Sequence, residues 1–127
     1  MNELIDAALD AASRLPSPPA FRVWCLAYRA GHTEEEAMKR AFRAVWWGLT
    51  KGRVDDFTRI LAHAETRLSV LKRDQIVGWA QAAAVRAVLE LMWSERHPSA
   101  EAAHEQRTRA ADIAAAALRF ARAADAR

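Results

Sequence analysis

Apolar residues recur every three or four positions along most of the chain, the spacing that puts side chains on one face of an α-helix. Prolines, glycines and capping residues separate these periodic segments. The expected helices span residues 2–15, 18–30, 33–50, 54–72, 75–96 and 99–124. Few segments show the alternation of β-branched residues that is typical of strands, so we expect no strand.

The last three segments have distinct apolar patterns. Segment 54–72 has a 3-4-3-4-3 spacing, typical of the seam of a bundle helix. Segment 75–96 is apolar on most sides, which is typical of a central helix or a shared interface. Segment 99–124 has a seam of mostly small residues, which permits close approach to another helix or to a second copy of the chain. The two seams are Val54, Phe57, Leu61, Ala64, Leu68 and Leu71, and then Ala103, Ala110, Ile113, Ala117, Phe120 and Ala124.

These patterns also predict caps and a core. Asp74 and Ser99 are the expected N-caps of the last two helices, because their side chains accept hydrogen bonds from free backbone N–H groups. The side chains expected in the core are Phe42, Trp46, Leu61, Leu68, Ile76, Val88, Leu91 and Phe120.

The joints between the expected helices contain two to five residues, so helices that follow one another should be antiparallel neighbours. A chain of 127 residues is long enough for one domain. The expected fold is therefore all-α, a single-domain helical bundle of residues 1–127 with about five to six antiparallel or orthogonal helices and short joints.

Composition and charge exclude several classes. With 52% hydrophobic and 28% charged residues, the chain is neither disordered nor loop-rich. The net charge of +3 is mild, and the preference for arginine over lysine is typical of a GC-rich genome. The single cysteine, Cys25, cannot form an intrachain disulfide. The longest apolar run, 113–118, is far too short to span a membrane, so we expect a cytoplasmic bacterial protein without a membrane partner.

Candidate catalytic and metal-binding residues are few. Glu101 and His104 have the Glu-x-x-His spacing of di-iron helices, but the pattern occurs once and puts His104 on the outer flank of its helix. His63 also falls on a charged flank, and Cys25 lies in an apolar turn, which favours packing over reactivity. No phosphate loop or catalytic motif is present. We therefore expect no catalytic residue, no cofactor site, no metal site and no enzymatic activity.

One cluster on the helix at 33–50 is a candidate for binding. Opposite its apolar stripe lies a basic face with an aromatic ring, formed by Arg40, Arg43, Trp47 and Lys51, with Arg53 just beyond. Arg22 and Arg29 share one face of the preceding helix, where they either extend this surface or form ion pairs with Asp or Glu. Such a face suits single-stranded nucleic acid, through phosphate neutralisation and base stacking. The alternatives are a second core around Trp47, with the arginine stems packed beside it, and a protein interface.

Two functional hypotheses follow. The first is a non-catalytic interaction or assembly module, a small helical subunit or regulator that binds a protein partner or a larger complex, because tryptophan anchors interfaces as well as cores. The alternative is a subunit that contacts the nucleic-acid backbone inside a nucleoprotein complex without reading its sequence. Small helical subunits of CRISPR effector complexes are an example of that class, by size and fold class alone and without a shared motif.

Overall fold

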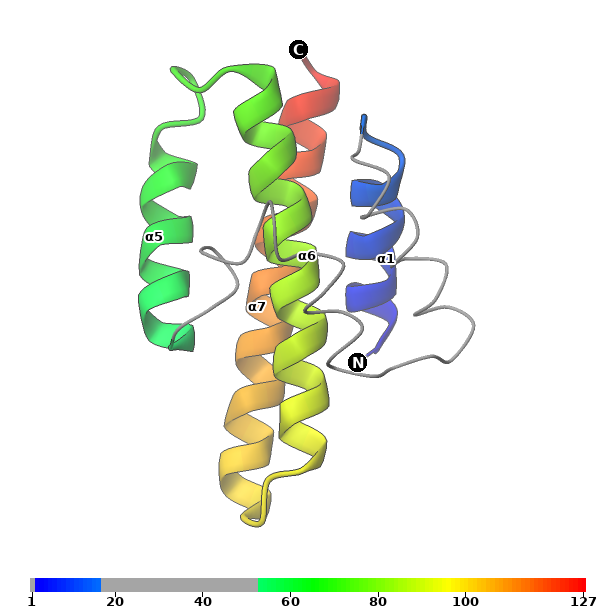
Figure 1. The fold of residues 1–127 in the computed structure, drawn as a ribbon, viewed down its shortest axis with the longest axis vertical. Helices are drawn as coiled ribbons and strands as arrows, with labels where there is room; N and C mark the ends of the chain where they lie inside the picture. The colour runs from blue at the N-terminus through cyan, green and yellow to red at the C-terminus, as the bar shows by residue number, and fades with distance from the viewer. Residues whose placement is uncertain (1, 17–52) are drawn as a thin grey trace.

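The computed structural model describes residues 2–16 and 53–127, and all the regular structure in these two ranges is helical (Figure 1). The helices are α1 (Asn2–Ser13), α5 (Val54–Thr66), α6 (Arg73–Glu95) and α7 (Ala100–Asp125). The all-α class is therefore confirmed for this part of the chain. The helices expected at 18–30 and 33–50 lie outside the described residues.

Helices α6 and α7 form a long antiparallel pair (Figure 1). Pro98 lies in the short turn between them, where a proline that cannot continue a helix is well placed. The side chain of Ser99 accepts a hydrogen bond from the N–H of Ala102 at 3.3 Å, which confirms Ser99 as the N-cap of α7. Near the other end of the pair, the rings of Trp79 and Phe120 stack with their centroids 6.2 Å apart.

Helix α6 is the central helix of the described part. It contacts α1, α5 and α7, and every residue from 80 to 91 is buried. This is the environment predicted by its apolar pattern. Among the described helices, α6 is also long and apolar enough to cross a membrane, but 78% of its apolar window is buried inside the protein.

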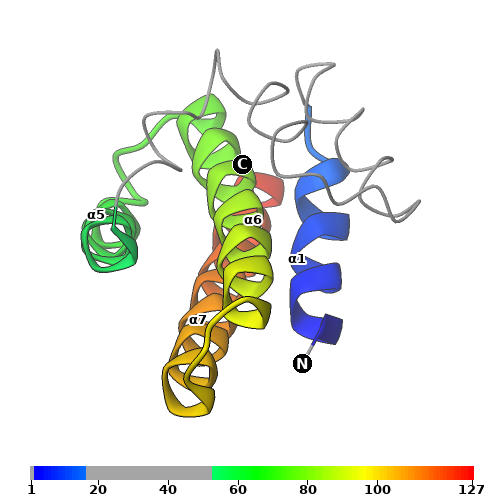
Figure 2. The same ribbon diagram turned by 60° about the horizontal axis from the view of Figure 1, so that its bottom comes forward.

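Helices α1 and α5 flank this pair on opposite sides (Figures 1 and 2). Helix α1 contacts α6 and α7 and buries Ile5, Leu9 and Ala12, and Leu15 is buried just beyond its end. Helix α5 buries only Phe57, Leu61 and Ala64. The alanine-rich seam of α7 is confirmed, because all six of its expected positions are buried.

Helix α5 is shorter than expected. It ends at Thr66 rather than at position 72, because Arg67 leaves the helical conformation (φ −109°, ψ 14°) and the chain turns toward α6. Leu68 and Leu71 keep the apolar spacing but lie in this turn, where each is only half-buried. The reversal into α6 therefore ends the helix before the apolar pattern ends. The expectation that Leu68 is buried in the core is wrong for the same reason.

The start of α6 also differs from the expectation. The helix begins at Arg73, so Asp74 lies inside the first turn instead of at the N-cap. The backbone N–H of Lys72 donates to Oε1 of Gln75 at 2.8 Å, which satisfies this N–H from the first turn of the helix. Asp74 accepts a hydrogen bond from the N–H of Gln75 at 3.0 Å, and its negative charge is favourable at the positive end of the helix dipole.

Most of the expected core is confirmed within the described residues. The buried members are Leu61, Ile76, Val88, Leu91 and Phe120. Phe42 and Trp46 lie outside the described residues, so their burial stays a prediction.

Candidate interaction site

The basic face predicted on the helix at 33–50 lies outside the described residues, as do its two predicted extensions. The residues concerned are Arg22, Arg29, Arg40, Arg43, Trp47 and Lys51. Arg53, predicted just beyond this face, is described. It is exposed and directly precedes α5, with no side-chain capping bond. The described residues therefore leave this face a prediction, and they form a candidate site of their own elsewhere.

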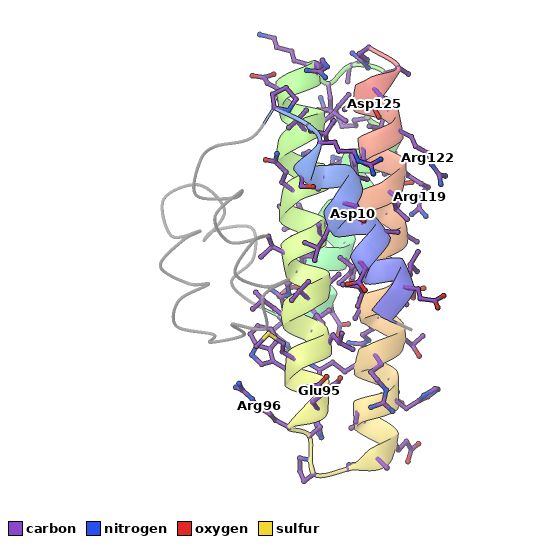
Figure 3. The ribbon with its side chains drawn as sticks, turned by 90° about the vertical axis from the view of Figure 1, so that its right-hand side faces the viewer. Asp10, Glu95, Arg96, Arg119, Arg122 and Asp125 are labelled. Carbon is purple, nitrogen blue, oxygen red and sulfur yellow. The ribbon has the colours of Figure 1, made fainter. Side chains whose placement is uncertain are left out.

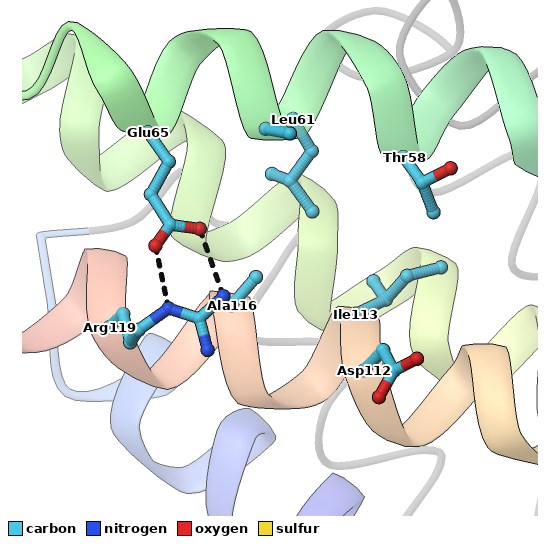
Figure 4. Close-up of a pocket in the computed structure, with 8 residues that line it drawn as sticks. Thr58, Leu61, Glu65, Asp112, Ile113, Ala116 and Arg119 are labelled. Atoms are coloured by element: carbon cyan, nitrogen blue, oxygen red, sulfur yellow. Dashed lines mark hydrogen bonds and ion pairs between the residues drawn. The ribbon is translucent and has the colours of Figure 1, made fainter.

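This candidate site is the groove between α5 and α7, a cavity of about 140 Å³. Leu61 of α5 points toward Ile113 of α7, and Ala116 completes the apolar floor (Figure 4). The cavity opens to solvent, because Ala62 and Asp112 at its rim are exposed. An apolar cavity of about 150 Å³ has room for a benzene-sized group, so this groove can receive one apolar side chain.

An ion pair closes one end of the groove. Arg119 of α7 donates to both carboxylate oxygens of Glu65 of α5, over 2.6 Å and 3.0 Å (Figure 4). These hydrogen bonds raise the pKa of Arg119 above its ordinary value; desolvation lowers it, and the charges of Glu65 and Asp112 raise it further. Because the Arg119 side chain is 51% exposed, the pair is expected to stabilise the fold by about 1 kcal/mol or less.

A second ion pair joins α5 to α7 near the beginning of α5. Nη1 of Arg109 lies 2.6 Å from Oδ1 of Asp55, and both side chains are largely exposed. Helix α5 is therefore attached to α7 mainly through a few buried side chains and two solvent-exposed ion pairs, with an unfilled space between the pairs. Protein interiors are usually packed without such spaces, so the contact of α5 with α7 is incompletely packed.

A third ion pair, between Arg86 and Glu90 of α6, lies inside the core rather than at the surface. Nε of Arg86 donates to Glu90 at 2.7 Å, and both side chains are almost fully buried. The guanidinium carbon of Arg86 lies 5.4 Å from the ring centroid of Phe57 and 5.5 Å from that of Trp93, within the range of cation–π attraction. Gln106 donates to the other oxygen of Glu90 at 2.9 Å. This buried network links α5, α6 and α7, and its burial keeps it from meeting a partner.

The histidines of the described part lie at the surface. His63, His97 and His104 are all exposed, and the exposed position of His104 agrees with its predicted place on the outer flank of α7. Glu101 is exposed as well. Within residues 2–16 and 53–127, no group of three or more His, Cys, Asp or Glu side chains is arranged to hold a metal ion.

Neither the Arg86–Glu90 pair nor the Glu65–Arg119 pair was predicted from the sequence. The Arg86–Glu90 pair could have been predicted, because two opposite charges four residues apart lie on one face of a helix. Since this helix is apolar all round, such a pair is expected to be buried. The Glu65–Arg119 pair could not have been predicted, because 54 positions separate the two residues and no periodic pattern connects residues of different helices.

No protein-family model, curated protein sequence or solved structure matches this chain.

Proposed function

We propose that the protein is a non-catalytic interaction module that binds a protein partner through the groove between α5 and α7. As part of this proposal, the whole chain forms one domain of five to six helices. The observation that carries the proposal is the groove itself, which opens to solvent at its rim and has the buried side chains of Leu61, Ile113 and Ala116 at its floor. Central pockets of this kind receive the anchoring side chains of protein interfaces.

The charges around the groove indicate the kind of partner. Glu65 and Asp112 are negative and Arg119 is positive, so the rim carries one net negative charge. Glu65 is paired with Arg119, whereas Asp112 has no ion-pair partner among the described residues. The groove therefore suits a protein segment with an aliphatic or aromatic side chain for the floor and a neighbouring lysine or arginine for Asp112.

The substitution Ala62→Leu tests this proposal. Ala62 is exposed at the rim, and a leucine there extends into the groove from α5. Filling a cavity tends to stabilise a fold, so the melting temperature should stay unchanged or rise. Binding of the partner should weaken at least about tenfold, which corresponds to about 1.4 kcal/mol, because the anchoring side chain loses its place.

Ala7→Leu is the matched control, since Ala7 is an exposed helical alanine on α1, on the other side of the molecule. Partners are first recovered with the wild-type protein from its native host, with and without nuclease treatment. A partner that survives nuclease, binds the Ala7→Leu variant and is lost by the Ala62→Leu variant supports the proposal. Equal binding by both variants would contradict the assignment of the groove.

A further inference from the structure

A second surface lies at the end of the molecule where the turn between α5 and α6 meets the last turn of α7 (Figure 1). We call it the basic end and define it by five exposed cationic side chains from three places in the sequence. They are Arg67, Lys72, Arg73, Arg122 and Arg127. The exposed carboxylates close to them in sequence are Asp74 and Asp125, so the positive charge is in excess.

Two of these cations are held in place by backbone carbonyl groups. Arg127 donates to the carbonyl oxygen of Leu71 at 2.6 Å and also to that of Leu68. Arg73 donates from Nε to the carbonyl oxygen of Ala124 at 3.2 Å. These contacts fix the guanidinium groups without neutralising them, because a carbonyl carries no net charge. A guanidinium has five N–H donors in a planar fork, so each group keeps donors for a further acceptor.

The other three cations make no ion pair with a described carboxylate. Lys72 and Arg73 also stand at the beginning of α6, the positive end of the helix dipole, where a cation destabilises the helix by about 0.3–1 kcal/mol. The hydrogen bond of Arg73 to Ala124 offsets this cost. Lys72 donates no side-chain hydrogen bond to a described residue, so folding does not explain its position, whereas attraction of an anion does.

An apolar side chain completes the surface. Val70 lies in the turn between α5 and α6 and is 68% exposed. A single valine contributes at most about 1.5–3 kcal/mol on full burial, which is too little to anchor a protein to a lipid surface. It is enough for contact with a sugar or a base edge beside a phosphate.

We propose that the basic end binds the phosphate backbone of nucleic acid without reading its sequence. Arginine forks match phosphate oxygens in bidentate geometry. When cations without carboxylate partners contact the phosphates, they release the counterions that the nucleic acid had condensed, and this release favours binding. This proposal is independent of the groove between α5 and α7, because the two surfaces share no defining residue.

The test measures binding of a fluorescently labelled 20-base-pair DNA duplex by anisotropy, between 50 and 200 mM salt. Each phosphate contact contributes about 0.9 to the slope of log affinity against log salt. If all five cations engage, the slope is about −4.5, and this increase in salt weakens binding roughly 500-fold. The triple variant Arg67→Gln, Lys72→Gln, Arg122→Gln should have a slope smaller in magnitude by about 2.7. These three side chains donate no hydrogen bond to a described residue, so the fold should keep its melting temperature.

A matched control removes the same charge from other surfaces, with Arg59→Gln, Arg96→Gln and Arg107→Gln. Arg96 lies at the opposite end of the α6–α7 pair (Figure 3), and none of the three belongs to the basic end. The control should keep nearly the wild-type slope. The proposal is overturned if the wild type binds no duplex at 50 mM salt, or if both triple variants lose affinity equally. It is also overturned if vesicles of anionic lipid bind more tightly than the duplex and the basic-end variant abolishes that preference.

Discussion

Arg86 and Glu90 form the most deeply buried ionic contact among the described residues. Moving two charges out of water costs several kcal/mol for each ion, and a buried pair returns this cost only with good geometry and further hydrogen bonds. Here Glu90 also accepts from Gln106, and the guanidinium of Arg86 lies over the rings of Phe57 and Trp93. The pair therefore joins α6 to α5 through Phe57 and to α7 through Gln106, and the desolvation of its two charges offsets much of their attraction.

Single substitutions in this pair should destabilise the fold strongly. Arg86→Met leaves the Glu90 carboxylate buried without its cation, and this should cost about 3–5 kcal/mol. Glu90→Met leaves Arg86 without its carboxylate, with a loss of similar size. The double variant buries neither charge, so it should be more stable than either single variant. Urea denaturation of all four proteins measures this coupling, and losses that simply add would contradict it.

At the scale of a helix, the apolar pattern predicted the existence and type of α1, α5, α6 and α7. One-sided burial imposes the period on α1, α5 and α7, and a central position makes α6 apolar on most sides. The pattern did not predict where α5 ends. Leu68 and Leu71 continue the period past Thr66 because they also meet the core, from a turn instead of a helix. Burial determines which positions of the sequence are apolar. Residues in a turn can be buried at the same spacing as residues in a helix, so the spacing does not show where the helix ends.

Gly78 lies inside α6, where glycine is an unfavourable residue. A glycine within a helix costs about 0.5–1 kcal/mol relative to alanine, and a Cβ built at Gly78 meets no atom within 4 Å. Gly78→Ala should therefore raise the free energy of unfolding by about 0.5–1 kcal/mol. Ala82→Gly, one turn further along the same helix, is the control and should lower it by at least as much. A loss of stability in Gly78→Ala would show that the added methyl group meets an obstacle.

At the scale of the whole molecule, the described helices differ in how completely they are packed. The central part of α6 is buried on every side, while α5 buries three side chains and leaves the groove open toward α7. This difference could not be predicted from the sequence. The seam of α5 has the more regular period, and a period shows which face is buried but not how well the facing surface fits it. The groove and the basic end both depend on residues that only the fold brings together.

The difference in packing predicts the order in which the helices open. Stability within a protein is uneven, and segments with few buried contacts open before the core. In native-state hydrogen exchange, the amides of α5 should therefore exchange faster than those at 80–91. Their exchange should also depend less on added denaturant, because this dependence scales with the surface exposed in the opening. Amides of α5 with the same protection and the same denaturant dependence as α6 would mean that α5 leaves only when the whole protein unfolds. In that case the groove is a fixed feature of the surface, and a partner would have to enter it without displacing the helix.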